Sequence, residues 1–303
     1  MRRKRVIGIL VALAAVLGAV GLVGAADMQG TSGADKLKGG DEADHIEGGR
    51  GDDELDGGGG DDALVGGGDS DTVDGGAGND RVHGATCDVR EVGFMCDNPG
   101  NETLRGGDGD DEVLANDCVI TFCAERSYIA LESTLDGGPG NDRVVGADDK
   151  DKLVGGDGDD QLSGLLGRDE LLAGAGADRA DGGDGGDQIA GNEGADTLIG
   201  GRGADGVYGG PDGDVAEGGD GDDRVFGGKG DDRLAGGPGV DVIGAGDGRD
   251  EVVGGPGDDR IRARDGRRDR ISCGAGKRDR ALVDRRDRVR GCERVRPRFR
   301  RRR

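Results

Sequence analysis

Aliphatic residues recur at every ninth position of the chain, each set in a polar, glycine-rich background. Between Gly137 and Arg262 the pattern runs without a break through fourteen nine-residue copies, the first of which is Gly137–Val145. The eighth position is aliphatic in twelve copies, and the exceptions are Ala180 and Ala216. An aliphatic residue between two flanking residues predicts a short strand whose middle side chain points inward. The pattern therefore predicts a solenoid to which each copy adds one strand.

The polar positions of the repeat are equally regular. The sixth is Asp in all fourteen copies, and the first and fourth are Gly in twelve copies each. Glycine tolerates positive φ and lets two backbones approach closely, so G-G-x-G can turn sharply while aiming its carbonyl oxygens at one point. Carboxylate and carbonyl oxygens are the ligands that calcium prefers. The repeat therefore predicts a turn suited to calcium, followed by a strand.

This nine-residue unit resembles the RTX, or haemolysin-type, calcium-binding repeat, G-G-x-G-x-D-x-U-x. The resemblance implies an all-β fold, a parallel β-roll whose successive turns alternate between two edges, so that stacked neighbours lie two repeats apart. It also implies several calcium ions between stacked turns, with an Asp from each turn contributing. The metal ligands expected on this basis are Asp35, Asp53, Asp62, Asp71, Asp80, Asp111, Asp142, Asp160, Asp178, Asp187, Asp196, Asp205, Asp214, Asp223, Asp232, Asp241, Asp250 and Asp259.

The glycine pattern also ranks these sites. The row Asp187, Asp205, Asp223, Asp241 and Asp259 is expected to be the strongest, because glycine dominates its turns. A separate row containing Asp151 and Asp169 is expected to be the weakest, because Ala147, Asp149 and Leu165 displace glycines.

The repeats fall into two blocks. Six copies run from Gly30 to His83, and two thirteen-residue insertions then interrupt the register. Each insertion precedes a degraded repeat that keeps its aliphatic residue but lacks the Asp, so we expect strands without calcium there. The predicted organisation is a signal peptide over 1–26, N-terminal repeats over 27–83, the Cys-containing insertions around one repeat over 84–136, the main roll over 137–262, and a cap with a basic tail over 263–303.

Composition and charge indicate why this chain needs a ligand to fold. One buried aliphatic side chain per repeat contributes about 1.5–3 kcal/mol, whereas ordering nine residues costs about 1–2 kcal/mol for each backbone unit. The net charge of −23 divides into +4 over residues 1–5, −41 over residues 6–259 and +14 over residues 260–303. Bound cations would remove the repulsion in the acidic part, so we expect calcium binding and folding to be one event. A disordered acidic linker is the alternative, but it does not require a regularly spaced aliphatic residue.

The first 26 residues resemble an export signal, with Arg2–Arg5, an apolar run and Gly24-Ala25-Ala26, and they predict a secreted or cell-surface protein. An uncleaved membrane anchor is the alternative, because Val6 to Ala26 is long enough to span a bilayer. Six cysteines in an exported chain predict disulfides, for which fifteen pairings exist. Their clustering favours Cys87–Cys96, Cys118–Cys123 and Cys273–Cys292; crossed pairing between the insertions and a zinc site built from the first four remain alternatives.

The C-terminal segment resembles the closing segment of secreted proteins of this repeat class from high-GC bacteria, in which a paired Cys finishes the roll. Its basic tail, Arg296 to Arg303, favours docking on the acidic roll or on an anionic cell-envelope polymer, and not on nucleic acid, because the body is acidic and exported. The chain has only two His and no nucleophile–base motif, so we expect neither a small-molecule substrate nor catalysis. The predicted function is calcium binding by an exported structural roll. The alternatives are a surface adhesin that uses the insertions at 84–136 or the basic tail, and an enzyme of an unrecognised type.

Overall fold

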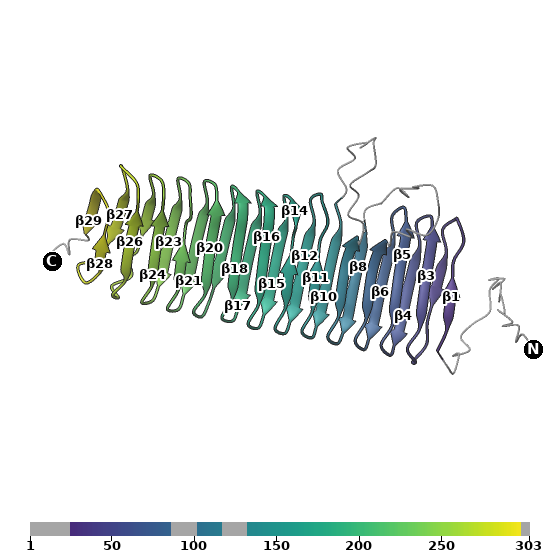
Figure 1. Ribbon diagram of the computed structural model, residues 1–303. Helices are drawn as coiled ribbons and strands as arrows, with labels where there is room; N and C mark the ends of the chain where they lie inside the picture. The colour runs from purple at the N-terminus through teal and green to yellow at the C-terminus, as the bar shows by residue number, and fades with distance from the viewer. Residues whose placement is uncertain (1–24, 86–101, 117–131, 298–303) are drawn as a thin grey trace, which may run out of the picture.

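A computed structural model describes residues 25–85, 102–116 and 132–297. Within these ranges the chain is all-β, and its strands stack side by side along one axis from β1 at one end to β28 and β29 at the other (Figure 1). The described residues include no helix long and apolar enough to cross a membrane. The predicted parallel β-roll is confirmed.

Strands alternate between two sheets as the chain proceeds. The first sheet consists of β1 (Asp27–Gln29), β3 (His45–Arg50), β5 (Ala63–Gly68), β7 (Arg81–Ala85), β9 (Glu112–Asn116), β11 (Arg143–Val145), β13 (Gln161–Ser163), β14 (Leu166–Gly167), β16 (Arg179–Gly185), β18 (Thr197–Gly203), β20 (Val215–Asp220), β22 (Arg233–Ala235), β24 (Glu251–Gly255), β26 (Arg270–Gly274) and β28 (Arg288–Arg290). The second consists of β2 (Lys36–Lys38), β4 (Glu54–Gly59), β6 (Thr72–Ala77), β8 (Thr103–Asp108), β10 (Thr134–Pro139), β12 (Lys152–Asp157), β15 (Glu170–Ala175), β17 (Gln188–Glu193), β19 (Gly206–Gly210), β21 (Arg224–Lys229), β23 (Val242–Asp247), β25 (Arg260–Arg262), β27 (Arg280–Val283) and β29 (Arg294–Pro297).

Neighbouring strands within each sheet are parallel and mostly eighteen residues apart. Val207 pairs with Val225, and Val225 pairs with Ile243. Across the insertions the spacing becomes thirty-one residues, as in the pairing of Val82 with Val113 and of Leu104 with Leu135. Each thirteen-residue insertion therefore leaves the register of the roll unchanged.

The core is a thin double row of aliphatic side chains between the sheets. Apart from the partly buried Leu37 in the first repeat, the eighth-position aliphatic residues of the regular repeats are buried, including the two small ones, Ala180 at 0% and Ala216 at 1% exposure. First-position residues such as Ala173 and Ala245 also point inward. The degraded repeats follow the same rule, since Leu104 and Leu135 are fully buried in β8 and β10.

Most strands are longer than the three residues that the pattern predicted. Strand β21, for example, continues from Arg224 through Gly228 to Lys229, and Gly228 and Lys229 still pair with Gly246 and Asp247 of β23. The turn glycines have no Cβ, so adjacent backbones stay close enough to keep pairing beyond the aliphatic triplet.

The C-terminal turns depart from the eighteen-residue register. The step is nineteen residues from Glu251 to Arg270 and twenty from Arg260 to Arg280. A disulfide joins Cys273, a buried residue of β26, to Cys292, with the Cα atoms 5.2 Å apart. The other four cysteines, Cys87, Cys96, Cys118 and Cys123, lie outside the described residues, and so do the basic residues beyond Pro297.

Candidate metal centre

The sixth-position aspartates form two hydrogen-bonded columns, one along each edge of the roll. In each column the backbone N–H of one Asp donates to Oδ1 of the Asp in the next stacked turn. The distance is 2.7 Å from Asp187 to Asp205, 2.9 Å from Asp205 to Asp223 and 3.0 Å from Asp223 to Asp241. Each carboxylate is therefore tied through one oxygen to the turn before it.

The two columns run almost the whole length of the described roll. The first contains Asp35, Asp53, Asp71, Glu102, Ser133, Asp151, Asp169, Asp187, Asp205, Asp223, Asp241, Asp259 and Asp279. The second contains Asp44, Asp62, Asp80, Asp111, Asp142, Asp160, Asp178, Asp196, Asp214, Asp232, Asp250, Asp269 and Asp287.

The columns correct one expectation. Asp151 and Asp169 are not a separate row, because Asp169 donates a 2.9 Å hydrogen bond to Asp187 and so belongs to the same column as Asp223. The two rows that the sequence ranking compared are therefore two parts of the same column.

The second carboxylate oxygen, Oδ2, has no hydrogen-bond partner at most of these positions although it is buried. An unpartnered buried carboxylate oxygen is costly in a folded protein, unless a cation supplies the missing interaction. The unpartnered atoms are Oδ2 of Asp53, Asp62, Asp71, Asp80, Asp111, Asp142, Asp160, Asp169, Asp178, Asp187, Asp196, Asp205, Asp214, Asp223, Asp232, Asp241, Asp250, Asp259 and Asp279.

At most of these positions a carbonyl oxygen of the next turn lies close to Oδ2, above the first glycine of the repeat. At Gly182 a Cβ atom would lie 2.5 Å from Oδ2 of Asp187 and 2.6 Å from the carbonyl oxygen of Gly200 in the next turn. The same pair of oxygens recurs above Gly218, where they come from Asp223 and Gly236. Among the described residues no three acidic, His or Cys side chains converge on one point. A cation here would therefore need backbone carbonyl oxygens beside the carboxylate, which is a ligand set suited to calcium.

Comparison with known families agrees with this geometry. The RTX calcium-binding nonapeptide repeat (4 copies) matches residues 29–64, 56–86, 98–118, 136–171, 172–207, 208–243 and 244–267. The chain belongs to the RTX calcium-binding repeat family. No curated protein matches it. Calcium binding by the roll follows from membership of the family, and the unpartnered Oδ2 atoms fit the ion chemically.

Burial of the RTX carboxylates shifts their protonation. Desolvation, opposed by the backbone hydrogen bond from the neighbouring turn, raises the pKa of Asp142, Asp214 and Asp241 to about 7. The charges of stacked aspartates add to this rise; Asp223 and Asp259, for example, act on Asp241. Without a cation, the folded roll holds part of each column protonated near neutral pH.

In three RTX turns a backbone N–H of the same turn donates to Oδ2 of the Asp, which distinguishes them from the turns with an unpartnered Oδ2. Oδ2 accepts from the second-position N–H at 2.6 Å in Asp35 and at 2.7 Å in both Asp44 and Asp151. The second-position residues there, Thr31, Gly40 and Ala147, do not adopt positive φ, whereas the usual second glycine does. Backbone conformation at the second position thus decides whether Oδ2 is left for a cation.

Leu165 shows that residue identity alone does not set this conformation. It replaces the second glycine and still adopts φ 74°, and its partner carboxylate, Asp169, keeps an unpartnered Oδ2. Asp35 was expected to be a ligand, and its Oδ2 has a hydrogen-bond partner; Asp169 was expected to belong to a weak row, and its Oδ2 has none. The only signal in the sequence for a partnered Oδ2 was a residue other than glycine at the second position. This signal is ambiguous, because Ala147 and Leu165 both replace that glycine and adopt different conformations.

In the degraded repeats the hydrogen bonds of the first column continue, although Glu102 and Ser133 replace the aspartates. Glu102 takes the place of Asp and accepts from the N–H of Asp71 at 3.0 Å through Oε2, while Oε1 is unpartnered. Desolvation raises the pKa of Glu102 to about 8. Ser133 follows, and its hydroxyl accepts a longer bond of 3.4 Å from the N–H of Glu102. With no carboxylate at Ser133, the column contains a gap between Glu102 and Asp151.

A second, exposed ladder was missed in the sequence. Fifth-position side chains accept from the backbone N–H of the following turn, so this ladder points the opposite way along the roll. Asp222 accepts from Val240 at 2.8 Å, and Asp110 accepts from Asn141 at 2.8 Å. The recurrent Asp or Asn at the fifth position was the available signal. These side chains tie turns together outside the core.

Proposed function

We propose that this protein is an exported, non-catalytic β-roll that folds when it binds several calcium ions between stacked turns. The observation that carries the proposal is the row of buried Oδ2 atoms without a hydrogen-bond donor, most of them beside a carbonyl oxygen of the next turn. Calcium would neutralise two columns of carboxylates that otherwise repel one another. The export assignment rests on the N-terminal segment and on the disulfide, which suits an oxidising compartment.

The proposed ligands are the aspartates whose Oδ2 is unpartnered. Relative to the expectation from sequence, the set loses Asp35 and gains Asp169 and Asp279. A non-catalytic role is inferred because these carboxylates are almost wholly buried, with Asp187, Asp241 and Asp259 at 0% exposure, and so are closed to a substrate.

A calcium titration of the mature chain tests this function. Circular dichroism and small-angle X-ray scattering should report an expanded, β-poor chain in chelator and a compact β-rich one in calcium. We expect cooperative binding with midpoints of about 10⁻⁴–10⁻³ M, the range of extracellular calcium modules. Magnesium at equal concentration is the control and should act weakly, because it demands a tighter octahedral site. Equal β content in chelator and in calcium would contradict the proposal.

A second candidate function is attachment to an anionic cell-envelope polymer through the C-terminal end. Both outer faces of the last turns present arginines: in the second sheet Arg260, Arg280 and Arg294 stack in register, and in the first sheet Arg270 stacks on Arg288. The exposed arginines that make no ion pair with any described residue are Arg260, Arg262, Arg268, Arg270, Arg280, Arg286, Arg288, Arg290, Arg294 and Arg296. Stacked like charges favour a bound polyanion.

Binding of the calcium-loaded protein to poly(glycerol phosphate) tests this second function. Arg280→Glu with Arg288→Glu should weaken binding at least about tenfold, and added salt should weaken it further. Arg224→Glu, farther along the second sheet, is the matched control and should have little effect. Equal losses from the control and the double variant would refute a site at this end.

A further inference from the structure

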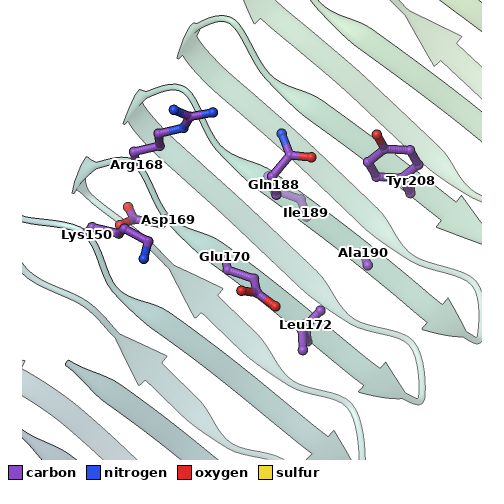
Figure 2. Close-up of a pocket in the computed structure, with 9 residues that line it drawn as sticks. All are labelled: Lys150, Arg168, Asp169, Glu170, Leu172, Gln188, Ile189, Ala190 and Tyr208. Atoms are coloured by element: carbon purple, nitrogen blue, oxygen red, sulfur yellow. The ribbon is translucent and has the colours of Figure 1, made fainter. Parts of the chain in front are cut away.

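The outer face of the second sheet carries an apolar column with one empty place in it. The ninth-position residues Val154, Leu172, Ala190, Tyr208 and Phe226 lie in register on β12, β15, β17, β19 and β21, and all of them point away from the core. Ala190 is the only one of these five with no side chain beyond Cβ. Figure 2 shows Ala190 between Leu172 on one neighbouring strand and Tyr208 on the other.

The two aromatic residues form a rigid wall on one side of Ala190. The rings of Tyr208 and Phe226 stack with centroids 5.5 Å apart and planes 9° apart. Phe226 in turn lies over Gly244, where a Cβ would come within 2.6 Å of the ring. One face of Tyr208 is thus covered by Phe226, and the other is free; Figure 2 shows this ring turned outward from the sheet beside Ala190. Tyr208 remains 40% exposed.

The space over Ala190 has the thickness of one ring. Leu172 and Tyr208 are two strands apart, which is about 9.6 Å at the usual strand spacing. A saturated ring in contact with both would need about 3.5–4.0 Å on each side. The space opens into a groove of about 570 Å³ that Lys150, Arg168, Glu170 and Gln188 border (Figure 2).

The rim of the groove offers both hydrogen-bond donors and hydrogen-bond acceptors. The Nε2 amide of Gln188 donates to the carbonyl oxygen of Asp187 at 2.8 Å, and this leaves its Oε1 as an acceptor. Glu170 adds carboxylate acceptors, and its ion pair with Lys152 is long, at 3.8 Å. Arg168 makes no ion pair with any described residue and adds donors. A flat ligand without polar edges would leave these groups unpaired, which is unfavourable.

We propose that the slot over Ala190 binds one pyranose ring of a glycan, stacked on the free face of Tyr208. The C–H bonds of a pyranose face carry partial positive charge and suit the negative face of an aromatic ring. Leu172 contacts the opposite face, while the equatorial hydroxyls reach Glu170 and Gln188; Arg168, farther along the groove, is placed for a neighbouring sugar unit of the glycan. This site is separate from the calcium columns, and it needs only that the roll be folded.

Tyrosine fluorescence provides a direct readout, because the chain has two Tyr and no Trp. In a Tyr128→Phe background, Tyr208 is the only emitter. The calcium-loaded protein would be titrated with maltohexaose, cellohexaose and chitohexaose, with circular dichroism confirming the β signal first. We expect a saturable change in emission for at least one of them, with a Kd on the order of 1 mM.

The variant Ala190→Leu tests the slot without disturbing the fold. The same column already accommodates leucine at Leu172, so the variant should keep its β signal while the new side chain fills the slot and weakens sugar binding at least tenfold. Val154→Leu, two strands from Ala190 in the same column, is the matched control and should bind as the parent does. The proposal is overturned if none of the sugars gives a saturable change, if Ala190→Leu binds as well as the parent, or if only an aromatic probe such as phenol competes for the slot. Loss of β signal in calcium would instead refute the proposed function.

Discussion

The backbone N–H of Asp205 donates a 2.9 Å hydrogen bond to Oδ1 of Asp223, while Oδ2 of Asp223 is buried without a partner. One carboxylate therefore has two separable tasks. Oδ1 joins neighbouring turns, and Oδ2 is left for a cation. The division would let one Asp of the repeat both link the turns and supply a ligand to the proposed calcium site.

Asp223→Asn separates these tasks, because the amide can keep its oxygen toward Asp205 while losing the charge. We expect the metal-free variant to be at least as stable as the parent, since a buried charge is removed. In calcium we expect reduced stoichiometry or cooperativity by calorimetry. Asp223→Ala should lose the hydrogen bond as well, at a cost of about 1–3 kcal/mol in urea unfolding. Asp222→Ala, in the exposed ladder, is the control and should cost less than Asp223→Ala; the reverse order would contradict the division of tasks.

The pH dependence of the metal-free roll should be opposite to that of a protein held together by ion pairs. Burial raises the pKa of Asp142, Asp214 and Asp241 from 3.8 to about 7, so the folded chain binds more protons than the unfolded chain between these values. Stability without calcium is therefore greatest at the acidic end and falls as the pH rises toward 7. In chelator, circular dichroism should show more β structure at pH 5 than at pH 7.5. In calcium the same acidification should release bound ions, because protons compete for the carboxylates. A chelated chain that gains β structure with rising pH would contradict these shifts.

Glycine at the fourth position should be intolerant of any side chain where the turns are closest. Gly203 has φ 144°, and a Cβ there would overlap the carbonyl oxygen of Gly185 in the preceding turn. We expect Gly203→Ala to lower the free energy of unfolding in calcium by more than about 1 kcal/mol, through backbone strain and loss of close stacking. At Gly186 the nearest atom to a Cβ would be the carbonyl oxygen of Ala204 at 3.6 Å, so Gly186→Ala should change stability little. Similar losses in both variants would show that the stacking distance is not the cause.

Replacement of Leu165 by glycine should stabilise the roll. It holds φ 74° with its side chain 44% exposed, so its conformation is strained and little packing opposes the strain. We expect Leu165→Gly to raise the calcium-loaded unfolding free energy by about 1 kcal/mol. Val240→Gly, at an exposed fifth position without positive φ, is the comparison and should not stabilise. A loss of stability in Leu165→Gly would mean that its side chain makes a contribution larger than the strain.

The disulfide should hold the last turns independently of calcium. Cys273 and Cys292 close a loop of nineteen residues, which is worth about 3 kcal/mol in the chain-entropy treatment. Cys273→Ser with Cys292→Ser should leave calcium binding in the central turns unchanged while β26 to β29 become accessible to proteases. Hydrogen exchange mapped by mass spectrometry across residues 245–295 measures this. Unchanged protection in the double variant would mean that the segment is not a cap.

The sequence by itself determined the repeat, its length, and which residues face inward. With an aliphatic residue at every eighth position, Leu153 and Val225 are expected to lie on the inner face of their strands. Both are fully buried. The Asp at the sixth position likewise identified almost all of the buried carboxylates. These features follow from local alternation, which a strand imposes regardless of its neighbours.

Only the tertiary structure decided how the turns interact. It confirms the eighteen-residue stacking that the resemblance implied, and this stacking joins Asp169 to Asp187 in one column, where the sequence ranking had placed them in two rows. It also decided that Ala147 turns its N–H toward Asp151 whereas Leu165, at the same repeat position, adopts positive φ and leaves Asp169 without a partner. Residue type alone therefore does not set the conformation at this position. The slot over Ala190 also depends on the tertiary structure, because residues eighteen apart become neighbours only once the strands pair.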